Sequence, residues 1–190
     1  AEWLESTRLL PHVDRTIRAL CCPPDVANPL VAAVDAALRL CYTADAFFRA
    51  HQPQLAQHVF AELAAGGAAQ RWDTAQYSLC LERLAEGRAL SVLTVEALGA
   101  ALAVARRNAD VRHCWCSLVV RNRATRCYGA VEALLVHDQA MGLYVFGLLL
   151  AAGSREHAIA KRVYATVSRS QDPQTHRMMR TMLINANLLP

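Results

Sequence analysis

The sequence predicts an all-α fold, arranged as a single-domain bundle of about eight amphipathic helices around one central buried helix. Apolar residues recur three and four positions apart along most of the chain, and no stretch shows the apolar–polar alternation of a strand. The apolar fraction is 54% and the aromatic fraction only 6%, so Ala, Leu and Val must build most of the core, and Ala and Leu favour helices. The chain is long enough to bury a sizeable core, and we expect residues 1–190 to form one domain.

The first two predicted helices are separated by the clearest breaker in the sequence, Cys22-Pro23-Pro24-Asp25. Before it, residues 2–21 carry apolar side chains at helical spacing, as one helix or as two pieces broken at Pro11. After it, Asn28-Pro29 combines a capping residue with a proline in the first turn, and the second helix runs to about Arg49.

Proline, glycine and aspartate mark the next two helices. Pro53 opens a third helix that Gly66-Gly67 ends, and Asp73 caps a fourth.

The segment 87–107 is predicted to be the central helix. Between Arg88 and Arg106 the only ionisable side chain is that of Glu96, and apolar residues lie on nearly all sides. A helix that is apolar all round belongs in the middle of a bundle.

The C-terminal half supplies the remaining helices. Residues 108–136 form one or two helices with Gly129 as the candidate break, and residues 138–150 form the next. Ser154 caps a helix over residues 154–168, and Asp172-Pro173 precedes a last one, so residues 154–190 add extra C-terminal helices.

The composition limits which partners and which cellular compartment we expect for this protein. The net charge of +4 comes from scattered residues, so no nucleic-acid partner is expected. The longest apolar stretch, residues 145–152, is too short to span a bilayer, so membrane association would need a segment outside this chain. Seven cysteines are an odd number and most lie in apolar helical patterns, which predicts free thiols in a reducing compartment.

The sequence offers little for catalysis or for metal binding. His137 and Asp138 are neighbours that point in different directions on a helix, and no Ser or Cys completes a triad. The run 113–116, His-Cys-Trp-Cys, with Cys127 downstream has the residue types of a zinc site, but the side chains of a helical Cys-x-Cys pair diverge. We therefore expect no enzyme, no metal and no cofactor.

A cluster of arginines is the one candidate for phosphate binding. Arg121, Arg123 and Arg126 follow Arg112. Such residues more often form the solvated face of a helix, and that interpretation is preferred here.

The pair Gly87-Arg88 opens the predicted central helix. A glycine there lets another backbone come close, and an arginine at the mouth of an apolar groove can pair with a carboxylate of a ligand. The alternative is an ordinary helix start with Gly87 as a cap and Arg88 in solvent, which the residues alone favour.

Three segments together resemble the homology regions of the Bcl-2 family. Residues 87–94, Gly-Arg-Ala-Leu-Ser-Val-Leu-Thr, resemble the first region, especially in viral members. Residues 40–47, Leu-Cys-Tyr-Thr-Ala-Asp-Ala-Phe, resemble the third, and residues 137–146 resemble the second. The segments follow the family's order and spacing, and the resemblance covers about residues 32–150. Ala85-Glu86 stands where the family has Asn-Trp.

This resemblance implies a protein that binds the amphipathic death-motif helix of pro-apoptotic partners in a surface groove. It implies that Gly87 admits the ligand helix, that Arg88 pairs with the ligand's aspartate, and that Leu40 and Asp45 pack inward. The groove would be completed by Phe47, Phe48, Leu55, Leu81, Leu84, Leu90, Ser91 and Val95.

The resemblance, with a basic complement that is arginine except for Lys161, points to a viral inhibitor of apoptosis. Such a protein would act in the host cytoplasm or at the mitochondrial outer membrane. One alternative is a Bcl-2-like adaptor that inhibits innate immune signalling, which the missing Asn-Trp favours. The other is an unrelated helical assembly module, and homodimerisation is left open.

Overall fold

The computed structural model describes residues 29–65, 72–167 and 173–189, and every longer regular element within these ranges is an α-helix. The all-α prediction is therefore confirmed, while the predicted helix over residues 2–21 lies outside the described residues. The α-helices are α2 (Pro29–Arg49), α3 (Pro53–Ala65), α4 (Thr74–Glu86), α5 (Val92–Ala101), α6 (Ala109–Arg121), α7 (Tyr128–His137), α8 (Gln139–Ala152), α9 (Ser154–Val167) and α10 (Pro173–Asn185), with short 3-10 helices η2 (Val104–Arg106) and η3 (Thr125–Cys127).

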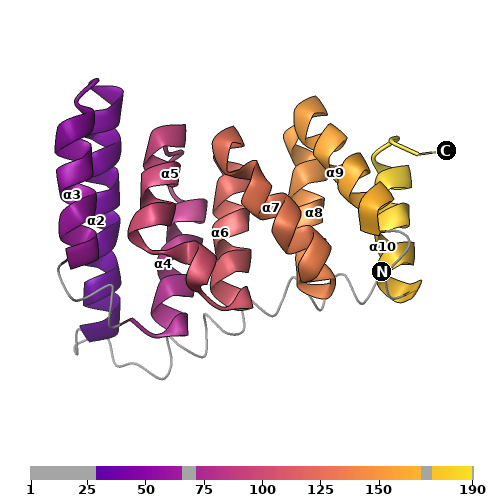
Figure 1. Cartoon of the computed structure of the whole chain (residues 1–190), viewed down its shortest axis with the longest axis horizontal. Helices are drawn as coiled ribbons and strands as arrows, with labels where there is room; N and C mark the ends of the chain where they lie inside the picture. The colour runs from indigo at the N-terminus through magenta and orange to yellow at the C-terminus, as the bar shows by residue number, and fades with distance from the viewer. Residues whose placement is uncertain (1–28, 66–71, 168–172, 190) are drawn as a thin grey trace.

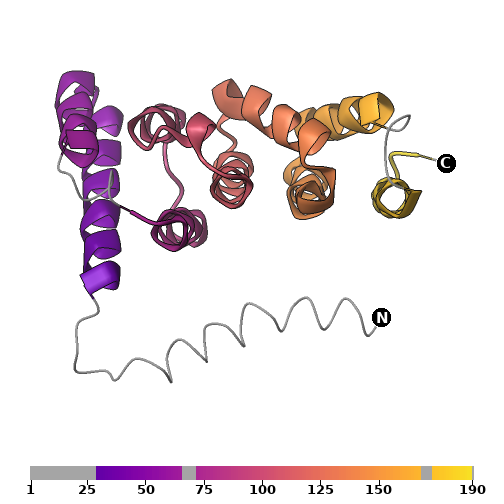
Figure 2. The same ribbon diagram turned by 60° about the horizontal axis from the view of Figure 1, so that its bottom comes forward.

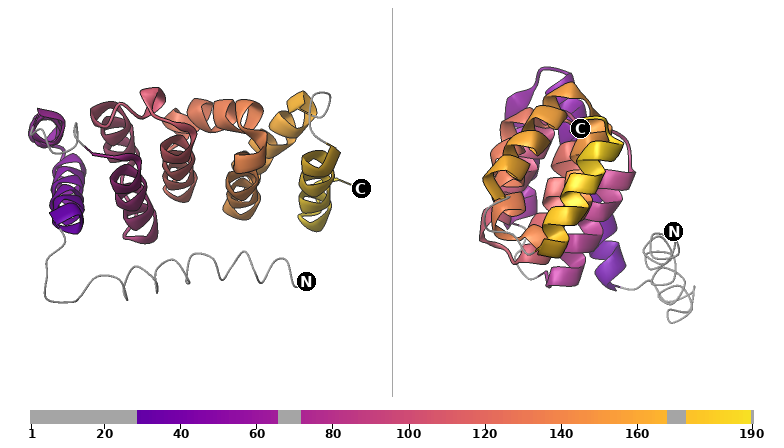
Figure 3. Two further views of the ribbon diagram at one scale, coloured as in Figure 1. Left: turned by 90° about the horizontal axis from the view of Figure 1, so that it is seen from below. Right: turned by 90° about the vertical axis from the view of Figure 1, so that its right-hand side faces the viewer.

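The helices stack in two layers. α2, α4, α6, α8 and α10 lie side by side in the first layer, and α3, α5, α7 and α9 form the second (Figures 1 and 3). Hairpins such as α2–α3, α6–α7 and α8–α9 bridge the layers. The row runs in one direction from α2 to α10, as the turned view in Figure 2 shows. Each helix thus packs mainly on its neighbours in the row, which is the arrangement of an α-solenoid.

The stack differs from the predicted bundle because residues 87–107 do not form the most buried helix. They form a loop, the ten-residue α5 and η2. Three residues of α5 are buried (Thr94, Val95 and Leu98), and Leu93 is 41% exposed. Four of the ten residues of α5 are Ala or Gly. These small residues make the helix apolar on all sides in sequence, but exposing them to solvent costs little free energy, so the helix need not be buried.

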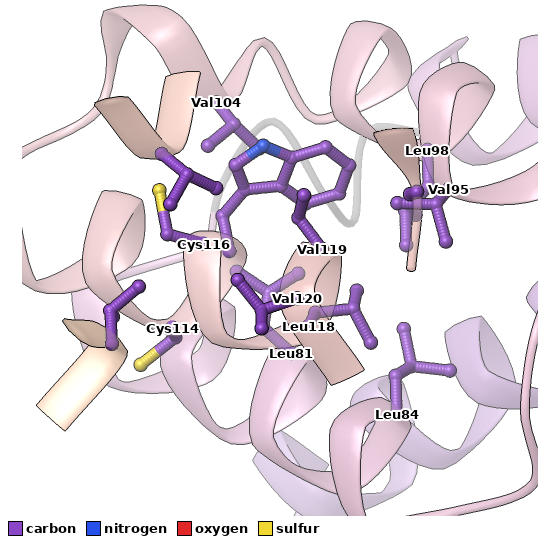
Figure 4. Packing of buried hydrophobic residues seen from close by; sticks show 14 of the residues in the cluster. Leu81, Leu84, Val95, Leu98, Val104, Cys114, Cys116, Leu118, Val119 and Val120 are labelled. Atoms are coloured by element: carbon purple, nitrogen blue, oxygen red, sulfur yellow. The ribbon is translucent and has the colours of Figure 1, made fainter. Parts of the chain in front are cut away.

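Helix α6 is instead the most buried helix of the described residues. Val111 and the whole run 114–120 are buried. Figure 4 shows side chains of α6 packed with Leu81 and Leu84 of α4 and with Val95 and Leu98 of α5. Cys114 and Cys116 take part in this packing as small apolar residues, which is why the helix looks less apolar in sequence than it is in space.

Local signals place most helix ends where they were predicted. Asp73 caps α4 through a reciprocal pair: its carboxylate accepts from the Gln76 amide at 2.9 Å, and the Gln76 side chain accepts from the Asp73 amide at 3.1 Å. Gly129 does not break a helix but lies in the first turn of α7, and the break falls at residues 122–127. Within the described ranges, no helix has the length and apolar character needed to cross a membrane.

Two glycines give a matched test of this packing. A Cβ at Gly99 of α5 would lie 2.5 Å from Cζ2 of Trp115, whereas a Cβ at Gly129 would meet nothing within 4 Å. Gly99→Ala should therefore lower the free energy of unfolding by about 1–3 kcal/mol, because the methyl group would overlap the indole ring. Gly129→Ala should raise it by about 0.5 kcal/mol, because alanine favours a helix. Urea unfolding measures both, and a stabilising Gly99→Ala would contradict the contact between α5 and α6.

Candidate functional site

The predicted groove mouth at Gly87-Arg88 is covered by α2 of the same chain. Nη2 of Arg88 donates to the backbone oxygen of Tyr42 at 2.9 Å, and its guanidinium carbon lies 4.6 Å from the centroid of the Tyr42 ring. A Cβ at Gly87 would lie 2.1 Å from the Tyr42 hydroxyl oxygen. A glycine is thus needed here for a close approach, as predicted, but the group that approaches is a side chain of α2.

Asp45, which was expected to pack inward, holds the loop 87–91 from the α2 side. Its side chain is in the core and the residue is 0% exposed. Oδ1 accepts from the Ser91 amide at 2.7 Å and from the Thr94 hydroxyl at 2.8 Å, and Oδ2 accepts from Nε of Arg49 at 2.7 Å. Burial alone would raise the pKa of Asp45, but the hydrogen bonds from Arg49, Ser91 and Thr94 together lower it.

Two further contacts fix the same loop. Arg49 also donates to the backbone oxygen of Ala89 at 2.8 Å. From the end of α6, the side chain of Asn122 accepts from the Leu90 amide at 2.6 Å. The loop is therefore a structural junction between α2, α4, α5 and α6.

The other predicted groove residues do not line one open groove. Leu81, Leu84, Leu90 and Val95 are buried core residues. Phe47 and Phe48 are partly buried against the core, as is Leu40. Leu55 is 48% exposed on α3, and Ser91 serves as the N-cap of α5. Helical spacing correctly indicated that most of these side chains are buried, but not that helices of the same chain bury them.

The two cysteines of the run 113–116 have different neighbours. Sγ of Cys114 contacts Oε1 of Glu82, whereas Sγ of Cys116 contacts the backbone oxygen of Ala130, each at 3.6 Å. Burial raises the pKa of the Cys114 thiol to about 11 and that of Cys116 to about 12. In the part of the chain that the structure describes, no three His, Cys, Asp or Glu residues are grouped to hold a metal ion, and the described cysteines are free thiols. Cys21 and Cys22 lie outside it.

The arginines considered for phosphate binding are each engaged by the protein itself. Arg112 pairs with Asp138 at 3.0 Å and Arg126 with Glu96 at 3.2 Å. Arg121 donates to the Tyr144 hydroxyl at 2.8 Å, and Arg123 donates to the backbone oxygen of Ala152 at 3.0 Å.

The surface best suited to bind a partner is the outward side of α8. We call it the α8 face: Met141, Tyr144, Leu148 and Ala151, spaced three or four residues apart. Tyr144 is 52% exposed and Met141 38% exposed. α8 has no charged residue along its length, so its uncovered side is as apolar as its buried one.

Basic side chains border this apolar strip. A hollow of about 190 Å³ lies between the ends of α6 and α8 and is lined by Leu148, Ala151 and Ala152 together with Val120, Arg121 and Arg123. The His113 ring lies 5.8 Å from the Tyr144 ring between centroids, and burial lowers the pKa of His113 despite the nearby Asp110. The α8 face thus combines an apolar floor with an arginine rim, which suits an apolar partner surface carrying carboxylates.

Sequence analysis missed the α8 face. The available signal was the absence of charge over residues 139–152, of which residues 145–152 were noted only as an apolar stretch too short to span a bilayer.

A two-layer row of helices with an uncovered apolar side defines an all-α domain that leaves one helix face open to a partner. The family model described as "Leukotriene A4 hydrolase, C-terminal" matches residues 72–183, so the chain belongs to this family. The chain is 34% identical to aminopeptidase O of Homo sapiens over 109 residues, and 35% identical to aminopeptidase O of Mus musculus over 109 residues. These matches cover 57% of this chain and 13% of each relative. No solved structure gives a significant match.

The family match overturns the Bcl-2 resemblance and what it implied. A viral apoptosis inhibitor, a Bcl-2-like adaptor and pro-apoptotic partners find no support in a chain related to leukotriene A4 hydrolase and aminopeptidase O. The expectation of a non-enzymatic protein is also wrong, because these relatives are peptidase-family proteins. The motifs have a structural cause: Asp45 accepts a hydrogen bond from the amide of Ser91, the N-cap of α5, and Gly87 makes room for Tyr42.

The junction at Asp45 can be tested directly. Asp45→Ala would leave the Ser91 amide, the Thr94 hydroxyl and Nε of Arg49 without their acceptor. We expect it to lower the free energy of unfolding at neutral pH by about 3 kcal/mol, measured by urea unfolding.

The pH dependence of that loss has a defined sign. Because the pKa of Asp45 is lower in the folded state, its stabilisation is present above the unfolded pKa of about 4 and is lost as the pH falls through the folded value. The difference between wild type and Asp45→Ala should therefore shrink in acid. A difference that grows in acid would contradict the lowered pKa.

Proposed function

We propose that this chain is the C-terminal helical domain of an aminopeptidase-type hydrolase, and that it holds its α8 face against the part of the enzyme that carries the catalytic groups. The observation that carries this proposal is the match of residues 72–183 to the C-terminal domain model of leukotriene A4 hydrolase. The chain spans about 13% of the length of the aminopeptidase O relatives that it matches, which supports a role as one domain of a larger enzyme.

The architecture supports a role in docking. α8 is held on its two sides by α6 and α10 and from the second layer by α7 and α9, so its outward side is presented on a packed support. On the inward side of α8, the side chains of Val145, Phe146 and Leu149 are 0% exposed. A surface fixed by such packing loses little conformational freedom when a partner binds.

The composition of the α8 face supports the same role. Tyr, Met and Arg are enriched at protein interfaces, and all three occur here as Tyr144, Met141 and Arg121. The proposed occupant is the catalytic part of the same enzyme, presenting apolar side chains to α8 and a carboxylate to Arg121 or Arg123. The Tyr144 hydroxyl already positions Arg121 beside the strip.

A chimera tests the proposal. Residues 29–190 of this chain, which keep Asp45 and the whole of α10, would replace the matching segment of human aminopeptidase O, and release of a fluorogenic amine from aminoacyl amides would be measured. We expect the chimera to hydrolyse these substrates. Tyr144→Asp with Leu148→Asp should reduce kcat/KM at least tenfold, because each places a carboxylate in an apolar contact, which costs more than about 1.4 kcal/mol.

The matched control is Leu93→Asp. Leu93 is also an exposed apolar residue, 41% exposed, but it lies on α5 in the second layer, where an aspartate in the first turn of a helix is well tolerated. This control should leave the activity unchanged. A folded but inactive chimera would contradict the family role, and an active chimera insensitive to the Tyr144 and Leu148 changes would contradict the docking face.

A further inference from the structure

His113 of α6 lies directly beside the α8 face. Its ring contacts the ring of Tyr144, with the centroids 5.8 Å apart and the planes inclined by 49°. His113 is partly buried, whereas Tyr144 is 52% exposed and forms part of the α8 face. A protein surface that rests on Tyr144 therefore also removes water from the His113 ring.

The protonated form of His113 depends on this water. A protonated imidazole has two N–H donors, and each needs an acceptor. Among the described residues the ring is in contact with Tyr144 and makes no hydrogen bond. The charge of Asp110, three residues earlier, favours protonation, but burial has the larger effect and lowers the pKa of His113. Removing the remaining water would disfavour the protonated form further.

Charged groups on the elements packed against α6 make their contacts with other groups. α8 has no charged residue, and Glu86, Arg106 and His137 are exposed at the ends of α4, η2 and α7. The remaining contacts are Glu82 with Cys114, Arg83 with Asp35, Glu96 with Arg126, Arg107 with the Tyr77 ring, Glu132 with Arg162, and Asp138 with Arg112. Arg121 donates to the Tyr144 hydroxyl and so places a positive charge beside the same strip, which also disfavours a second one on His113.

We propose that docking of the catalytic part of the enzyme on the α8 face requires a neutral His113, so that docking releases a proton and weakens in acid. This inference rests on the proposed function and adds a means of regulation to it. His113 acts through Tyr144: it lies under the ring that the partner contacts, and its charge decides whether the apolar strip can be closed off from water.

The direction of the pH dependence follows from proton linkage. Docking lowers the pKa of His113, so the docking equilibrium is unaffected above the pKa of His113 in the free chain and weakens as the pH falls below it. Since one proton is released, the weakening is at most about tenfold per pH unit. Burial already lowers the pKa of His113 in the free chain, so the weakening falls on the acid side of neutrality.

Hydrogen–deuterium exchange at the imidazole Cε1, followed by mass spectrometry over a range of pH, measures the pKa of His113 in the free 190-residue chain and in the chimera with human aminopeptidase O. We expect a lower pKa of His113 in the chimera, because the docked partner excludes water from the ring. An equal or higher pKa of His113 in an active chimera would overturn the inference.

A substitution tests the effect of this proton on activity. His113→Phe keeps an aromatic ring against Tyr144 but cannot take up a proton, so the kcat/KM of this chimera relative to the wild-type chimera should rise at least about threefold from pH 8 to pH 5.5. The matched control is His58→Phe, because the His58 side chain is 72% exposed on α3, and its ratio should stay constant. A constant ratio for His113→Phe would also overturn the inference. An inactive chimera contradicts the proposed function itself, whereas an active chimera in which His113 titrates as in the free chain contradicts only the proton linkage.

Discussion

The arrangement of the first half of the chain depends on one buried carboxylate. Asp45 of α2 accepts hydrogen bonds from the first residues of α5, 46 and 49 positions further along the chain. A carboxylate in the core is stable only when donors surround it, so α5 must begin where Ser91 and Thr94 can reach Asp45. This requirement sets the position of the second layer relative to the first. Asn122, which follows the last residue of α6, connects the C-terminal end of α6 to the same loop.

Local signals in the sequence were enough to locate the helices, but not to predict which parts of the chain pack against each other. Asp73 marks a helix start because capping depends on residues within one turn, and the predicted start at Ser154 is the first residue of α9. Gly87 indicated a close approach, yet whether a ligand or Tyr42 approaches depends on a residue 45 positions away. The short motifs that resembled another family reflect such contacts, whereas the family match extends over residues 72–183.

At the candidate site, too, the sequence indicated the helix but not which of its sides is covered. An uncharged segment such as residues 139–152 fits either a buried helix or a helix with one uncovered side, and periodicity cannot separate the two. The layer arrangement decides between them, because neighbours cover α8 on three sides only.

The stacked arrangement also has a mechanical consequence. In a row of helices where each element rests mainly on its neighbours, small rotations at successive contacts add up, so the domain can bend along its length while every individual interface stays packed. A bend of this kind would change the angle between the α8 side chains and whatever rests on them without unfolding any helix. The stiffness of the stack is therefore set at each junction separately: the α2–α5 end is fixed by the hydrogen bonds of Asp45, and the α8–α10 end is held by buried apolar side chains such as Leu149 and Leu183.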